Sequence, residues 1–324
     1  MKILILQSRM GIGDMVIYLP FIEAIAKKFD TKVSLLVKEN SKAEEILKNN
    51  KYIDKIIFLK RSNKKERHDG FVGSIKLAKD LRKFNFNKIF IFNSSLRYNL
   101  IAKLSGIKEI YQYPLLKKKN QHVIKAAQDF IKEKLNLEIE SNPKINLNET
   151  EIRTIRHKYN FDNSTLNILL GTGGSGPNKR ISASIYKSII DMCKKKYKCR
   201  FFIATGKNEE EQKILTEIIS EESNNFTRLD DLSISEIIPI IKNCTLSICN
   251  DTSFSHLSAA LELETIILFA DTATLYGSYN SKMHPIKPDH NEYKNKKLLP
   301  REKINPKAVF EKFEEVLSKL NLLK

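Results

Sequence analysis

Short, unbroken apolar runs recur along this chain of 324 residues, and they limit its fold more than any other feature. A strand that is apolar at every position is buried on both faces, which is typical of a parallel sheet covered by helices. In the first half such runs occupy residues 2–6, 32–37, 55–59 and 88–92. Helical periodicity occurs between and after them, at residues 14–28, 42–49, 71–84, 95–104 and 121–135. The first half therefore predicts an α/β domain with a doubly wound parallel sheet.

The same alternation resumes after residues 136–165, a stretch that is poor in apolar residues and is expected to hold one linking helix. Strands are predicted at 166–171, 200–205, 245–250 and 265–270, and helices at 182–197, 208–220, from 253 onward and at about 306–320. We predict two Rossmann-like domains, 1–148 and 149–324, facing across a cleft at the carboxyl ends of both sheets. The terminal helix is a candidate to pack back toward the first domain.

The charge of the chain is large and unevenly distributed. The formal net charge is +18, and residues 1–150 carry 30 Lys and Arg against 16 Asp and Glu, a net of +14. Two basic clusters, 60–67 and 116–122, stand out. Such a field attracts nucleic acid, anionic membranes or phosphorylated substrates. Nucleic acid is disfavoured because no aromatic stacking pattern accompanies the lysines; a Lys-rich, solvated surface without a partner is the alternative.

Several classes of protein are disfavoured by what the sequence lacks. No apolar run reaches the roughly 20 residues of a membrane-spanning helix, and the opening MKILIL is shorter than a signal-peptide core. We therefore expect a cytoplasmic protein. The four cysteines form no C-x-x-C pair, and no histidine pair at zinc spacing accompanies them. We expect no metal and no cofactor.

The first turn with candidate chemistry follows the first predicted strand, at residues 7–16. Gly11 and Gly13 permit a tight turn, and Asp14 is expected to open the helix. The turn is not a dinucleotide fingerprint, because Val16 stands where that motif needs its third glycine. Asp14 is either a helix N-cap or a general base.

A second turn, residues 171–182, combines flexible backbone with two cations. Its sequence GTGGSGPNKRIS contains Gly174 and places Lys179 and Arg180 before a predicted helix, an arrangement that suits a pyrophosphate. It is not a Walker A loop, in which the lysine follows the last glycine directly. An ordinary surface loop with solvated cations is the alternative.

Two further turns lie at strand ends in the second half. In residues 204–212, Glu210 could accept a hydrogen bond from a ribose, or could belong to the solvated first turn of a helix. In SICNDTSFSHLSAAL, residues 247–261, a polar turn joins a buried strand to a helix. Its side chains either cap that helix or border an anion site made by the free amides. The candidates in this turn are Asp251, Thr252, Ser253, Ser255 and His256.

These motifs, taken in order, resemble those of glycosyltransferase family 9, the heptosyltransferases. Residues 251–261 are similar to the family's D-[TS]-G-x-x-H-x-A-A-A-L signature, and residues 2–25 resemble its opening strand and S-x-x-G-D-x-x-x-x-L-P turn. Residues 176–180 resemble G-P-x-K-R-W, and residues 92–107 resemble the N-S-x-[KR]-S-A-L stretch of the second heptosyltransferase. The resemblance extends over nearly the whole chain and implies the GT-B fold.

The resemblance implies an inverting, metal-independent transferase that moves heptose from ADP-heptose to a lipopolysaccharide inner-core acceptor at the inner face of the inner membrane. The first domain would bind the acceptor, with Gly13 and Arg97 in contact and Asp14 as the base. The second would bind the nucleotide sugar through Gly174, Lys179, Arg180, Glu210 and the 251–256 turn, where His256 would support the loop.

Three positions depart from the family pattern. Ser253 stands for a glycine, Ile181 for a tryptophan and Asp271 for a proline, and a shifted donor or acceptor would account for all three. The rival functions are a sugar-nucleotide epimerase on the same fold, an inactive nucleotide-sugar-binding relative, and a basic nucleic-acid-binding protein.

Overall fold

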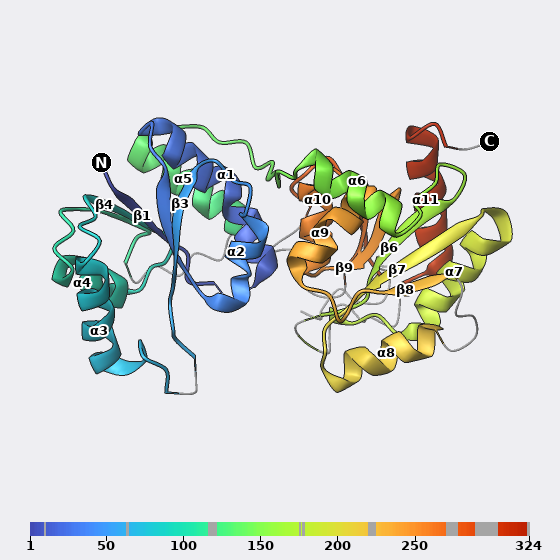
Figure 1. The fold of residues 1–324 in the computed structure, drawn as a ribbon, viewed down its shortest axis with the longest axis horizontal. Coiled ribbons are helices and arrows are strands. Elements are labelled where there is room, and N and C mark those ends of the chain that lie inside the picture. The colour runs from blue at the N-terminus through green and yellow to red at the C-terminus, as the bar shows by residue number, and fades with distance from the viewer. Residues whose placement is uncertain are drawn as a thin grey trace. The chain divides into compact units, whose positions relative to one another are not determined.

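The computed structural model describes residues 1–9, 11–62, 65–115, 122–174, 176, 179–219, 225–269, 278–288 and 304–322. The chain divides into two compact units, Met1–Asn146 and Leu147–Lys324, and each is built around its own parallel sheet. Figure 1 shows both as α/β units with helices on the two faces of the sheet. The predicted α/β class, with two doubly wound parallel sheets, is confirmed.

The first unit holds a five-stranded sheet in the order β3-β2-β1-β4-β5, in which every neighbouring pair is parallel. Its strands are β1 (Ile3–Leu6), β2 (Val33–Val37), β3 (Ile53–Phe58), β4 (Lys88–Ile91) and β5 (Glu109–Gln112). Its helices are α1 (Ile12–Lys28), α2 (Ala43–Ile46), α3 (Gly70–Arg82), α4 (Leu96–Leu104) and α5 (Val123–Leu135). Helices α3 and α4 bury Leu77, Leu81, Tyr98 and Ile101 in one cluster with the strands.

The second unit holds a six-stranded parallel sheet in the order β11-β10-β9-β6-β7-β8. Its strands are β6 (Leu166–Gly171), β7 (Cys199–Ala204), β8 (Phe226–Arg228), β9 (Leu246–Asn250), β10 (Thr265–Leu268) and β11 (Met283–Ile286). Its helices are α6 (Glu149–Lys158), α7 (Ala183–Lys196), α8 (Glu209–Ile219), α9 (Ile234–Asn243), α10 (Ser253–Ala260) and α11 (Pro306–Lys319). In both units the strand order reverses at one point, beside β1 and beside β6, where such sheets bind ligands.

The terminal helix α11 belongs to the second unit. Val309, Phe313 and Val316 lie in the same core cluster as residues of β6 and α7, and none of the three is exposed by as much as 1%. The apolar face of α11 therefore packs on the sheet of its own unit.

Four elements were not expected from the sequence: β5, β8, α9 and β11. All three strands are at the edge of a sheet; β8 has three residues, and β11 contains Pro285, which an edge strand tolerates. Helix α9 contains Pro239, which interrupts the helical pattern, yet Ser233 and Glu236 form a capping box at its start. This S-x-x-E spacing is the sequence signal that could have predicted the start of α9.

Candidate functional site

The candidate site of the second unit lies where the strand order reverses, between the carboxyl ends of β6 and β9. Asn250, the last residue of β9, crosses this gap: its Nδ2 donates to the carbonyls of Thr172 at 2.8 Å and Gly173 at 3.1 Å. The Tyr186 hydroxyl donates to Asn250 Oδ1 at 2.9 Å. All of these partners are buried. The two loops that carry the predicted residues are therefore held together by a residue that the sequence analysis did not select.

Lys179 and Asp251 meet at this point, although 72 residues separate them. The ammonium of Lys179 lies 3.3 Å from Asp251 Oδ2 and 3.4 Å from the Asp251 carbonyl oxygen. The Asp251 side chain is 4% exposed and that of Lys179 19%. Lys179 is thus placed beside the start of α10, and Asp251 holds its ammonium there.

His256 lies on the other side of Asp251. Its Nε2 is 3.8 Å from Asp251 Oδ1, its Nδ1 is 2.8 Å from the Tyr279 hydroxyl, and the two rings stack with centroids 5.6 Å apart. The pKa of His256 is lowered to about 4, chiefly by burial; the charge of Asp251 opposes the shift, and the charge of Lys179 adds to it. His256 is therefore neutral at pH 7 and braces Asp251 and Tyr279.

The start of α10 differs from the capping arrangement considered from the sequence. Thr252 is the N-cap residue, but its side chain makes no capping hydrogen bond, and Ser255 Oγ donates back to the Thr252 carbonyl at 2.8 Å. Asp251 is engaged by Lys179. The Thr252 hydroxyl therefore does not cap α10, whose amino end carries the partial positive charge that favours an anion.

Ser253 is accommodated without strain in this position. It is the first residue of α10 and is absent from the residues with positive φ, so its backbone needs no glycine. Ile181, which stands for the family's tryptophan, is fully buried in the core of the second unit. Asp271 lies outside the described residues.

Arg180 and two glutamates organise the glycine loop. Arg180 Nε donates to the Gly174 carbonyl at 3.0 Å, and its guanidinium pairs with Glu210. Glu211, which the sequence analysis passed over, is 5% exposed and accepts from the Gly174 amide at 2.6 Å and from Asn208. Arg180 is 9% exposed, so it supports the loop rather than standing open to solvent as an isolated cation.

The glycines of the loop leave room for these side chains. A Cβ on Gly173 would lie 2.9 Å from Glu211 Oε1, and one on Gly174 would lie 3.1 Å from both Lys179 Cβ and Arg180 Cγ. Glu210 is the outer member of the pair, with 69% of its side chain exposed. All the residues predicted for the second unit thus belong to loops and helix starts at the carboxyl edge of one sheet. They are Gly174, Lys179, Arg180, Glu210, Asp251, Thr252, Ser253, Ser255 and His256.

In the first unit, Asp14 lies near the equivalent reversal point, after β1. The helix begins at Ile12, so Gly11 is the N-cap residue; Asp14 lies in the first turn, and the alternative that it is the N-cap is wrong. Its Oδ2 accepts from the Gly11 amide at 3.4 Å, and its Oδ1 lies 3.7 Å from Arg9. Gly13 is buried inside the helix rather than in the turn. Across the edge, Asn93 Nδ2 donates to Ser8 Oγ at 2.8 Å.

Arg97, in the first turn of α4, donates to the His68 carbonyl. Burial is the main cause that lowers its pKa, and the nearby Arg61 adds to the effect. Arg97 therefore ties α4 to the segment that precedes α3, and the guanidinium of Arg61 lies in the same region.

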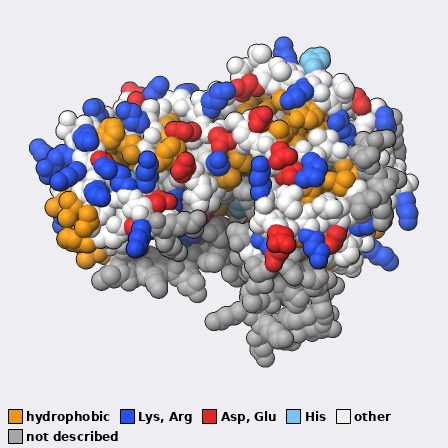
Figure 2. Space-filling view, turned by 60° about the horizontal axis from the view of Figure 1, so that its bottom comes forward, with side chains coloured by type: hydrophobic (Ala, Val, Ile, Leu, Met, Phe, Trp, Pro, Cys, Tyr) orange, Lys and Arg blue, Asp and Glu red, His pale blue; other side chains and the backbone are white. Residues whose placement is uncertain are grey.

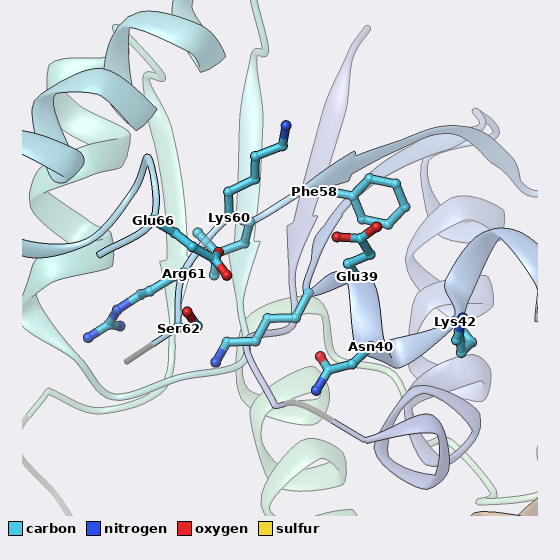
Figure 3. A pocket seen from close by; sticks show the side chains of 10 residues that line it. Glu39, Asn40, Lys42, Phe58, Lys60, Arg61, Ser62 and Glu66 are labelled. Carbon is cyan, nitrogen blue, oxygen red and sulfur yellow. The ribbon is translucent and has the colours of Figure 1, made fainter. Parts of the chain in front are cut away.

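A pocket of about 400 Å³ lies beside the carboxyl ends of β2 and β3 (Figure 3). Its charged lining residues are Lys38, Glu39, Lys42, Lys60, Arg61 and Glu66. The described part of the 60–67 cluster thus borders a cavity in which four cations face two acids. Residues 63–64 of that cluster and 116–121 of the other lie outside the described residues.

None of the helices described is long and apolar enough to cross a membrane. Nor do the described His, Cys, Asp and Glu side chains form a group that could hold a metal ion.

Comparisons with known proteins agree with the order of the motifs. A family model described as glycosyltransferase family 9 (heptosyltransferase) matches residues 92–305. The chain is 22% identical to lipopolysaccharide heptosyltransferase 1 of Campylobacter coli, over 93% of both chains. Its structure is similar to E. coli ADP-heptose lps heptosyltransferase II, with a TM-score of 0.77, 14% identity and coverage of 99% and 100%. For E. coli heptosyltransferase WaaC with ADP the TM-score is 0.73, the identity 14% and the coverage 98% and 100%.

The family model covers well over half of the chain, and the solved heptosyltransferases share the fold of both units. This protein belongs to glycosyltransferase family 9, the heptosyltransferase family, and is a glycosyltransferase of lipopolysaccharide biosynthesis with the GT-B fold.

Proposed function

We propose that this enzyme transfers heptose from ADP-heptose to an inner-core sugar of lipopolysaccharide, with inversion at the transferred carbon. One observation carries the proposal: Lys179, the amino end of α10 and the glycine loop meet where the strand order reverses. This arrangement suits a diphosphate. Among the solved relatives, WaaC was determined with ADP and with ADP-2-deoxy-2-fluoro heptose, which supports an ADP-sugar donor.

In the proposed reaction the bond between the sugar and the diphosphate breaks, and negative charge accumulates on the leaving ADP. The ammonium of Lys179 and the first amides of α10 would stabilise that charge. Since these groups supply positive charge by themselves, the proposal needs no divalent cation. His256, neutral and buried, would keep Asp251 in place instead of exchanging protons with the substrate.

The acceptor hydroxyl must lose its proton as the new bond forms. We assign this role to Asp14, whose carboxylate is 13% exposed and lies at the carboxyl end of β1. The acceptor would bind in the first unit, where Arg97 and the cations of the 60–67 cluster match its phosphates. The reaction would take place in the cytoplasm at the inner face of the inner membrane.

A turnover assay with truncated lipopolysaccharide cores and a panel of nucleotide sugars, including ADP-heptose, tests the proposal. We expect transfer from ADP-heptose in buffer containing EDTA, with the opposite anomeric configuration in the product. Turnover of a different nucleotide sugar, a strict requirement for a divalent cation, or retained configuration would each contradict a part of it. ADP binding without any turnover would favour the inactive relative.

A further inference from the structure

Exposed apolar side chains in the first unit are concentrated on two neighbouring helices. Of the nine large hydrophobic side chains described as exposed, six lie on α3 and α4. The six are Phe71 at 81%, Val72 at 62%, Ile75 at 38%, Leu96 at 47%, Leu100 at 50% and Leu104 at 53% exposed. We call this set the α3–α4 patch. In Figure 2 hydrophobic side chains gather at the end of the first unit where Figure 1 places α4.

The sequence of each helix explains why these side chains point away from the core. Leu96, Leu100 and Leu104 follow one another at intervals of four residues and therefore line a single face of α4. The core of the unit takes up a different face, which carries Tyr98 and Ile101. Leucine at three successive outward positions is unusual for a helix that faces only water, since that face is normally polar.

The two helices that carry the patch are rich in cations. Helices α3 and α4 together carry five basic residues and one acidic residue; the five are Lys76, Lys79, Arg82, Arg97 and Lys103. The one acid, Asp80, is paired with Arg67 and His68. Apolar side chains bordered by Lys and Arg are typical of a surface that enters the interfacial region of an anionic bilayer.

We propose that the α3–α4 patch is a membrane-docking surface, which inserts its apolar side chains among the acyl chains of an anionic bilayer while the flanking cations contact the headgroups. The long stems of Lys and Arg let their charges reach the headgroups above a buried leucine. This proposal rests on the surface of the first unit and is independent of the donor assigned above.

Charge decides between a bilayer and the other occupants of such a face. Two copies of this chain would bring together two surfaces that both belong to a region of net charge +14, and the repulsion opposes a dimer. Protein–protein interfaces are depleted in lysine, whereas three of the five cations on these helices are lysines. An anionic bilayer can bind both the apolar side chains of the patch and the cations on the same helices.

Helices α3 and α4 also begin at the functionally relevant edge of the sheet. Each follows the carboxyl end of a strand, β3 and β4, so Phe71, Val72 and Leu96 lie in first turns near that edge. A bilayer that contacts the patch would therefore adjoin the edge at which parallel sheets bind ligands. Docking would bring a membrane-borne acceptor to the unit that we expect to bind it.

The absence of tryptophan from the sequence permits a direct test. Leu100→Trp introduces a single reporter into the patch, and Leu322→Trp introduces one at an exposed leucine of the second unit. With vesicles of phosphatidylcholine and phosphatidylglycerol, we expect the emission of Leu100→Trp to shift to the blue and to be quenched by brominated lipid. The emission of Leu322→Trp should not change, and equal responses of the two reporters would overturn the proposal.

A second experiment measures partitioning by cosedimentation with the same vesicles. Leu100→Gln/Leu104→Gln should weaken binding roughly 10-fold or more, because each partly buried leucine contributes about that factor. Leu322→Gln is the matched control and should bind like the wild type. Unchanged binding of the double variant would overturn the proposal, and so would a wild-type protein that does not bind anionic vesicles. Light scattering that shows a change of oligomeric state in the double variant would identify a protein interface instead.

Turnover with a water-soluble, truncated acceptor separates this inference from the proposed function. Without vesicles the double variant should retain the wild-type rate, since the patch contains no residue of the proposed reaction. If the wild type fails to turn over ADP-heptose yet binds vesicles through the patch, the donor assignment fails and the docking surface stands.

Discussion

At the scale of single residues, the structure changes what Lys179 is expected to do. From the sequence it was a free cation suited to phosphate, whereas its ammonium lies within 3.4 Å of two oxygens of Asp251. A diphosphate that binds at the start of α10 must compete with that carboxylate. We therefore expect the affinity for ADP to depend on both members of the pair.

Lys179→Ala should weaken ADP binding by about 1.5–3 kcal/mol, the usual contribution of a hydrogen bond to a charged group. Lys179→Ala leaves Asp251 facing the diphosphate, so Lys179→Ala/Asp251→Asn should recover part of the loss. Calorimetric titration with ADP measures both. Lys282→Ala, which removes an ammonium paired with Glu264, is the control and should leave the affinity unchanged.

Asp14→Asn should lower kcat by roughly 10²-fold or more, because asparagine keeps the shape of the side chain but cannot accept the proton. ADP affinity should stay the same. Steady-state kinetics give the first quantity and titration the second, and Glu23→Gln in the same helix serves as control. A variant with near-normal kcat would leave Asp14 with a structural role at the start of α1.

His256 predicts a pH dependence of stability. Its pKa is lowered from 6.5 to about 4 in the folded protein, so the unfolded chain binds more protons between these values. The free energy of unfolding should therefore fall as the pH decreases through this window, by at most about 1.4 kcal/mol per pH unit from this group. Urea unfolding of His256→Gln should show a shallower dependence. His157→Gln, an exposed histidine of α6, should behave like the wild type.

At the scale of elements, the glycine loop after β6 owes its position to neighbours from other strands. Glu211 of α8 accepts from the Gly174 amide, and Asn250 of β9 donates to Thr172 and Gly173. The loop is rich in glycine and has few side chains that could fix its conformation, so these two residues fix it. The adjacent glutamates of α8 thus differ: Glu211 is buried and holds the loop, whereas Glu210 is exposed.

Glu211→Ala should lower the free energy of unfolding by about 2 kcal/mol or more, because a buried carboxylate with several donors is lost and those donors stay unsatisfied. Glu210→Ala is the matched control at the preceding position, and because 69% of the Glu210 side chain is exposed, its loss should cost less than about 1 kcal/mol. Urea unfolding compares the two. Equal losses would show that the buried carboxylate does not hold the loop.

At the scale of the whole molecule, the distribution of charge predicts how salt acts on the enzyme. Reversing Lys60 and Arg61 to Glu should raise the KM for a membrane-borne acceptor, since each cation near an anionic surface contributes about 1 kcal/mol. The affinity for ADP should not change. Reversing Lys194 and Lys195, exposed or half-buried in the last turn of α7, is the control.

The difference in acceptor KM between the Lys60, Arg61 variant and the Lys194, Lys195 variant should decrease as the salt concentration rises. The reason is that charges more than about 10 Å apart are screened at 0.1 M salt. Acceptor kinetics at several salt concentrations measure this. An acceptor KM that is the same in wild type and in the Lys60, Arg61 variant would mean that this cluster only keeps the protein soluble.

The α/β class, most of the central strands and the set of residue types at the strand ends could be predicted from the sequence alone. These features are local: a strand buried on both faces is apolar at every position, and a polar turn between strand and helix is visible in a few residues. The sequence also placed Lys179, Arg180 and Asp251 at two strand ends of one domain. The edge strands β5, β8 and β11 escaped detection because their own residues are few or only partly apolar.

Which of these residues meet depends on the fold and could not be predicted from the sequence. Lys179 pairs with Asp251 across 72 positions, Asn250 binds Thr172 across 78, and Glu211 holds Gly174 across 37. From the sequence alone, a polar side chain has many possible hydrogen-bond partners. The packing of β6 against β9 determines which of them lies within reach. The α3–α4 patch has the same origin, since the leucines of α4 resemble core residues until the fold buries the opposite face of the helix.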